Sequence, residues 1–169
     1  MNSHVLALMP LICVWVVGGT ALAIIDIRTH RLPNPIVLGM YPCVLISVWI
    51  AGLLTGESEW GQAMIGAAIW LVVLGTVWLG TAGAGMGFGD VKLAPLLGFS
   101  LGWFGWELAS FGLICAWCIA GMYAGLLILS RRVNRSTTIA FGPFLLVGFW
   151  LAMVFGPGVV RGGSPWLWV

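Results

Sequence analysis

Long apolar runs alternate with short polar breaks along the whole chain. A helix needs about 20 apolar residues to cross the hydrocarbon core of a bilayer, and most of the runs approach that length. The candidate spans are Val5–Ile25, Pro35–Leu54, Gly61–Thr81, Val91–Trp106, Leu108–Ser130 and Ile139–Phe155. The fourth span is short and carries Lys92 and Pro95 near its start. The pattern predicts a single all-α domain over residues 1–169, a polytopic membrane protein with about six transmembrane helices.

The breaks between the spans are polar, acidic, glycine-rich or basic. They are the polar stretch Asp26–Asn34, the acidic stretch Thr55–Trp60, the glycine-rich stretch Ala82–Asp90, a turn at Glu107 and the basic stretch Arg131–Thr138. The tail from Gly156 to Val169 is rich in Gly, Pro and Trp, and we expect it to lie at the membrane interface.

Composition supports a bilayer as the solvent. The chain is 61% hydrophobic and only 7% charged, whereas soluble domains carry roughly a quarter charged residues. These values exclude an ordinary soluble domain and a disordered chain. The net charge of +2 gives no support for nucleic-acid binding. Because no Lys or Arg precedes Arg28, we expect the first span to be a retained helix, not a secretory signal.

The basic residues predict the orientation. With the N-terminus outside, the inner loops hold Arg28, Arg31, Lys92, Arg131, Arg132 and Arg135. The outer side then holds Arg161, Glu57, Glu59 and Glu107. Cytoplasmic loops collect Lys and Arg, so the sequence favours this orientation, with the N-terminus outside.

The chain contains two aspartates, Asp26 and Asp90. Asp26 ends the first span on its way in, and Asp90 opens the fourth span on its way out, so both lie near the same membrane face. Ionisable residues at membrane depth are costly and are candidates for function. A close pair of carboxyls shares one proton: the ionised member can activate water, and the protonated member can polarise a carbonyl. This chemistry requires no metal and no cofactor.

Each aspartate also has a structural interpretation. Asp90 could cap the fourth helix, but Asp26 fits a capping role poorly because negative charge is disfavoured at a helix C-terminus. From the polarity of its own helix, we expect Asp26 to be the more easily protonated member and Asp90 the more easily ionised one.

The neighbours of the aspartates are less specific. The stretch Gly85-Met86-Gly87-Phe88-Gly89-Asp90 could pair with an extended substrate or form a flexible loop. We interpret Arg28 and Lys92 first as anchors for lipid phosphates and second as groups that tune the carboxylates. The cysteines are expected to be small apolar packing residues, with no metal site: Cys13, Cys43, Cys115 and Cys118.

Pairs of small residues one helical turn apart let helices approach closely. Gly98/Gly102 and Gly121/Gly125 are two such pairs. They can pack the bundle internally or form a dimer, and the sequence leaves both alternatives open.

Three stretches of the sequence carry a family resemblance. They are Asp26-Ile-Arg-Thr-His-Arg-Leu-Pro33-Asn34, Gly87-Phe-Gly-Asp90-Val-Lys92-Leu93 and Phe141-Gly142-Pro143-Phe144-Leu145. Together they resemble the type IV prepilin peptidase family of GxGD aspartyl membrane proteases. The chain looks like a short form without the N-methyltransferase domain.

The resemblance implies an aspartic endopeptidase, a multi-pass protein of the inner (cytoplasmic) membrane. Asp26 and Asp90 would be the catalytic pair. The expected substrates are prepilins or pseudopilins, whose basic leader is removed at the cytoplasmic face, and the expected partners include membrane lipids. The resemblance also suggests which residues line the substrate site: Gly87, Phe88, Gly89, Lys92, Phe141, Gly142 and Pro143.

Two other functions remain open at this point. One is a transporter or channel that uses Asp26 and Asp90 as a proton or cation relay, although a relay usually needs polar groups through the midplane. The other is a non-catalytic scaffold for a pilus or secretion machine, which predicts that Asp26→Asn is harmless.

Overall fold

The computed structural model describes residues 3–29, 32–56, 58–83, 86–130 and 141–161. Six helical segments cross the molecule, which confirms the predicted all-α polytopic architecture. The first segment is continuous and consists of α1 (Ser3–Val14), the π-helix η1 (Trp15–Gly19) and α2 (Thr20–Thr29). The others are α3 (Asn34–Thr55), α4 (Trp60–Gly80), α5 (Phe88–Gly102), α6 (Trp106–Leu129) and α7 (Gly142–Arg161).

Several predicted boundaries were wrong. The first segment continues past Ile25 to Thr29, and α5 begins at Phe88, so both aspartates lie inside helices. Glu107 lies in the first turn of α6, because the chain turns earlier at Gly105, whose φ of 130° only glycine adopts easily.

The predicted end of the last span at Phe155 was also wrong, whereas the interfacial location of the tail stays a prediction. Helix α7 continues to Arg161, since a proline in an apolar helix is tolerated when neighbouring groups satisfy the backbone. Three expectations lie outside the described residues: the basic stretch with Arg131, Arg132 and Arg135, the start of the last span at Ile139, and the rest of the tail.

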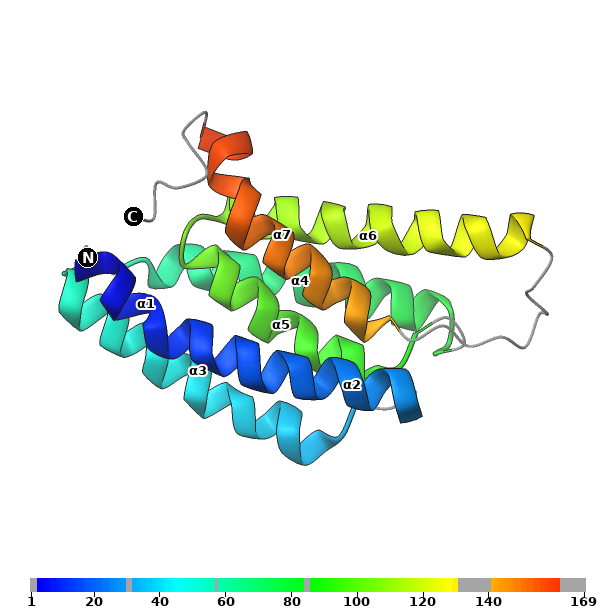
Figure 1. The fold of residues 1–169 in the computed structure, drawn as a ribbon, viewed down its shortest axis with the longest axis horizontal. Coiled ribbons are helices and arrows are strands. Elements are labelled where there is room, and N and C mark those ends of the chain that lie inside the picture. Colours follow the sequence, from blue (N-terminus) through cyan, green and yellow to red (C-terminus); the bar gives the residue numbers. More distant parts are fainter. Residues whose placement is uncertain (1–2, 30–31, 57, 84–85, 131–140, 162–169) are drawn as a thin grey trace.

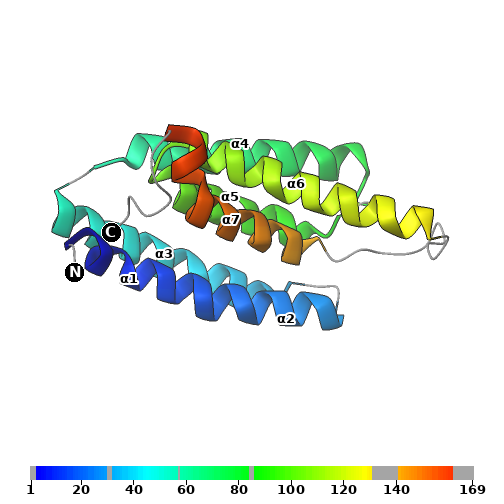
Figure 2. The same ribbon diagram turned by 45° about the horizontal axis from the view of Figure 1, so that its top comes forward.

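The helices form two layers around α5. Figure 2 shows the first segment and α3 side by side below α4, α5, α6 and α7. Helix α5 contacts α3, α4, α6 and α7, and in Figure 1 it crosses the middle of the molecule. The ends of α2, α4 and α6 and the starts of α3, α5 and α7 lie toward one end of the bundle, while the starts of α1 and α6 lie toward the other end.

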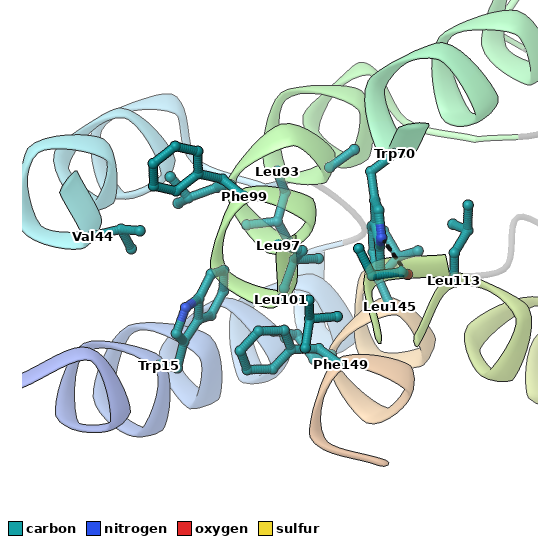
Figure 3. Packing of buried hydrophobic residues seen from close by; sticks show 14 of the residues in the cluster. Trp15, Val44, Trp70, Leu93, Leu97, Phe99, Leu101, Leu113, Leu145 and Phe149 are labelled. Carbon is teal, nitrogen blue, oxygen red and sulfur yellow. Dashed lines mark hydrogen bonds between the residues drawn. The ribbon is translucent and has the colours of Figure 1, made fainter. Parts of the chain in front are cut away.

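The core is built around α5. Leu93, Leu97 and Leu101 on this helix have no exposed surface, and Figure 3 shows them between Trp15 and Phe149 on one side and Trp70 on the other. Helix α5 has 15 residues and is therefore shorter than a typical bilayer-spanning helix. It is surrounded by other helices of the protein. Within the described part of the chain, four other helices are long and apolar enough to cross a membrane: Ala7–Thr29, Asn34–Thr55, Trp60–Gly80 and Trp106–Leu127.

Glycines let α4 and α5 approach until their backbones touch. A Cβ on Gly66 would collide with the carbonyl oxygen of Gly98, and a Cβ on Gly102 would lie 2.6 Å from the carbonyl oxygen of Gln62. The Gly98/Gly102 pair therefore packs inside the bundle. A Cβ on Gly121 or Gly125 would meet nothing within 4 Å, so this pair lies open on α6.

The outer surface of the bundle is apolar. Exposed side chains such as Val17, Leu53 and Leu129 would be unfavourable in water and suit lipid. Cys13, Cys43 and Cys118 are also exposed, which corrects their expected place in the packed interior.

Candidate active site

Asp26 and Asp90 lie on different helices at the same end of the bundle. Asp26 is in the last turns of α2 and Asp90 is in the first turn of α5. Each is only 4% exposed, and among the described residues they are the two buried ionisable side chains. The other buried polar residues, Ser47 and Ser100, each donate a hydrogen bond to a carbonyl oxygen of their own helix.

Gly142, the first residue of α7, lies beside both carboxyls. Its backbone N–H donates to Asp26 Oδ2 at 3.1 Å. A Cβ on Gly142 would lie 2.7 Å from Asp26 Oδ2 and 3.3 Å from Asp90 Oδ1. Because both oxygens surround this one point, they lie within about 6 Å of each other. The structure therefore forms the close pair that the sequence predicted.

The start of α7 leaves the Gly142 amide available for this bond. The first amides of a helix have no partner within it. Pro143 has no N–H, and the N–H of Phe144 donates to the carbonyl oxygen of Phe141 at 3.1 Å. The Phe141 ring packs against Trp117 on α6, with ring centroids 5.4 Å apart, which holds the start of α7 in place.

Asp90 is held less completely. The backbone of Gly87 hydrogen-bonds to its carboxyl, but Oδ1 has no hydrogen-bond partner in the structure. Asp90 lies outside the four described helices that are long and apolar enough to cross a membrane. Burial raises the pKa of its carboxyl, the charge of Asp26 raises it further, and the Gly87 backbone bond opposes both.

Of the glycines in the described part of the glycine-rich segment, only Gly87 has the extended, exposed backbone that could pair with a substrate. Gly87 is extended and exposed, but the helix begins at Phe88, so the chain is not strand-like beyond that point. A Cβ on Gly89 would lie 2.7 Å from Leu32 Cβ, so this glycine accommodates Leu32 of the same chain. Phe88 is half exposed, and its ring packs against Trp78 at 5.0 Å.

Lys92 binds Asn34, a residue of the first motif for which no role was predicted. Its Nζ donates to Asn34 Oδ1 at 2.9 Å and lies 4.8 Å from the centre of the Phe88 ring. The hydroxyl of Tyr41 donates to the Lys92 carbonyl oxygen at 2.7 Å. Lys92 thus connects the start of α3 to α5. The adjacent Pro33-Asn34 in the first motif was the sequence feature that could have indicated this contact.

The described residues include no cluster of three or more His, Cys, Asp or Glu side chains placed to hold a metal ion. Arg28 lies exposed at the end of α2. His30 and Arg31 fall outside the described residues. The substrate-lining roles of Gly87, Phe88, Gly89, Lys92, Phe141, Gly142 and Pro143 stay predictions.

Comparison with known proteins identifies the family. The sequence profile of the type IV leader peptidase family matches residues 11–129, which include both aspartates. The prepilin leader peptidase/N-methyltransferase of Aeromonas salmonicida is 34% identical over 158 residues, 91% of this chain and 51% of the relative. The Aeromonas hydrophila and Escherichia coli proteins of the same name are 35% and 34% identical, over 91% and 75% of this chain.

The chain spans about half the length of these Aeromonas relatives. No solved structure is significantly similar to it. The profile match covers most of the chain and both buried carboxyls of the site. The chain therefore belongs to the type IV leader peptidase family.

Proposed function

We propose that the protein is an intramembrane aspartic endopeptidase that cleaves the leader peptides of prepilins or pseudopilins. One observation carries the proposal: two buried carboxyls, distant in sequence, meet at one end of the bundle in a chain of this family. The relatives are named for leader cleavage, which indicates the substrate class. Positive charge in the adjoining loops favours the cytoplasmic face of the inner membrane.

The pair can hydrolyse a peptide bond with water alone. The ionised carboxyl takes a proton from a water molecule as its oxygen attacks the scissile carbonyl carbon. The protonated carboxyl donates its proton to the carbonyl oxygen, and a tetrahedral intermediate forms. The intermediate collapses as its C–N bond breaks: the leaving nitrogen takes the proton that the first carboxyl received from water, and a hydroxyl of the intermediate returns a proton to the second carboxyl, which restores the starting pair. One water molecule is consumed, and an acid and an amine are released.

The surroundings of the pair suit a membrane-embedded peptide. Gly87 is exposed and extended immediately before α5, so its backbone can pair with an extended substrate. The chain has few acidic residues, so anionic lipid headgroups would help to hold a basic leader. A transport function gains no such support, because the described buried polar groups at mid-bundle are serines.

Co-expression with a candidate prepilin tests the proposal. We expect the wild type to yield the processed band, while Asp26→Asn and Asp90→Asn each abolish processing and still insert into the membrane. Glu107→Gln is the matched control, since it makes the same carboxyl-to-amide change on α6 at the opposite end of the bundle. Processing by either Asn variant at the wild-type level would reject the proposal, as would a wild type that processes no prepilin.

A further inference from the structure

The proposed catalytic pair is contacted by a third element, the start of α7. We infer that Gly142 is a positioning residue whose amide keeps the negative charge of the pair on Asp26 and so leaves the shared proton on Asp90. This inference rests on the proposed function. It is the reverse of the assignment expected from each aspartate's own helix.

The polarity of α7 supports the charge on Asp26. The first-turn amides give a helix N-terminus a partial positive charge, which favours an anion placed against them. Helix α7 begins at Gly142 and is 20 residues long. Its first amide donates directly to Asp26 Oδ2 at 3.1 Å. Hydrogen bonds to a carboxylate are stronger than those to a neutral carboxyl, so this contact favours the ionised form of Asp26.

The surroundings of Asp90 favour the proton there. Its Oδ1 is buried and has no hydrogen-bond partner, which is costly for a charged carboxylate. Lys92, two residues further along α5, directs its ammonium to Asn34. Arg28 is exposed at the end of α2. From α5, α2 and α3, the described charged groups therefore leave Asp90 without a cation that holds its charge.

The missing side chain of Gly142 matters as much as its amide. A Cβ there would lie 2.7 Å from Asp26 Oδ2, closer than real Cβ contacts, and 3.3 Å from Asp90 Oδ1. Any other residue would have to push the Asp26 carboxylate away from the amide or move α7. The family resemblance suggested Gly142 only as a residue that lines the substrate site, and the profile match at residues 11–129 does not reach it.

This arrangement gives each carboxyl a distinct role. Asp26, which carries the charge, takes the proton from water. Asp90, which carries the proton, donates it to the scissile carbonyl oxygen. The N–H of Gly142 touches neither water nor substrate in this scheme; it acts through Asp26.

A substitution at Gly142 tests the inference by kinetics on the purified full chain. We expect Gly142→Ala to lower kcat by about 100-fold, because a small displacement of a catalytic group is enough for such a loss. KM should change by less than about twofold. Since the displaced Asp26 carboxylate loses the Gly142 donor and binds protons more readily, activity should disappear at a higher pH on the acidic side of the profile.

Two glycine variants separate this role from packing. Gly121→Ala on α6 enters open space and should keep the wild-type kcat within about twofold. In Gly148→Ala on α7, the new Cβ would lie 2.6 Å from Ala116 Cβ, so this variant should lower thermal stability but keep the wild-type pH profile. If Gly142→Ala retains the wild-type kcat and pH profile, or behaves like Gly148→Ala, the inference is wrong.

Infrared spectroscopy at neutral pH tests the location of the proton without any variant at Gly142. We expect the C=O band of a protonated carboxyl in the wild type, its loss in Asp90→Asn and its persistence in Asp26→Asn. Persistence in Asp90→Asn together with loss in Asp26→Asn would overturn the inference. The infrared band does not depend on cleavage. A wild type without peptidase activity would refute the proposed function, and the infrared spectra would still show which aspartate holds the proton.

Discussion

At the scale of single residues, Asp90 connects function to stability. Burial raises the pKa of its carboxyl, so the folded chain keeps a proton that the unfolded chain has already released. The resulting stabilisation is fully present below the ordinary Asp pKa of about 4 and is lost as the pH rises to the raised value. The folded protein should therefore become less stable between mildly acidic and neutral pH.

Asp90→Asn removes this dependence, because a neutral amide has no proton to lose. We expect the variant to have a higher thermal midpoint than the wild type at neutral pH and a flatter dependence on pH, although it does not cleave. Thermal unfolding in detergent at several pH values measures both. Glu107→Gln, at an exposed carboxyl, serves as the control and should follow the wild-type curve. A wild type whose stability rises toward neutral pH relative to Asp90→Asn would contradict this prediction.

The residues of the site differ in how far sequence could predict them. Asp26 and Asp90 were predictable because charge is scarce in the chain and because motifs surround both. The roles of Gly142 and Gly89 were not predictable: each depends on a contact with a distant residue, Asp26 in one case and Leu32 in the other. A glycine in a sequence indicates that space is needed but does not indicate which group needs it.

At the scale of helices, the π-helix η1 sets the direction in which Asp26 points. A π-turn holds one more residue than an α-turn, so it rotates everything that follows relative to what precedes it. Leu11, before η1, and Trp15, within it, are fully buried. Trp15 Nε1 donates to Ser100 Oγ at 2.9 Å. Leu22 and Asp26, which follow η1, are also buried. The extra residue allows both halves to face the core.

Deleting Gly18 should convert η1 into a regular α-turn and rotate α2 by about 100°. We expect α2 to rotate instead of α1, because Leu11 and Trp15 anchor the first half. Asp26 then leaves the site and cleavage is lost, while the protein still inserts. Deleting His4 in the first turn of α1 is the control and should preserve cleavage. Full processing by the Gly18 deletion would show that η1 does not position Asp26. Apolar periodicity gave no indication of this element, since the run Val5–Ile25 is hydrophobic on all sides.

At the scale of the whole molecule, sequence predicted the number of helical segments better than their surroundings. The fourth span was expected to be a weak transmembrane helix, but α5 is enclosed by α3, α4, α6 and α7. Its shortness follows from this position, because a helix inside the bundle need not match the bilayer thickness. Which helices surround it depends on long-range contacts such as Gly66 with Gly98, and no local pattern contains them.

Because successive helical segments alternate in direction, the bundle has only two possible orientations: N-terminus outside or N-terminus inside. The ends of α2 and α4 and the starts of α3, α5 and α7 lie at the end of the bundle that holds the aspartates, and the ends of α3 and α5 and the starts of α4 and α6 lie at the other. With the N-terminus outside, alkaline phosphatase fused after Gly56 or Gly105 should be active, because that enzyme matures only outside the cytoplasm. Phosphatase fused after Gly83 or Ser130 should be inactive. A fluorescent protein that fluoresces only in the cytoplasm should be fluorescent when fused at these two positions. The reverse pattern would place Asp26 and Asp90 on the outer face, where a leader peptide still in the cytoplasm could not reach them.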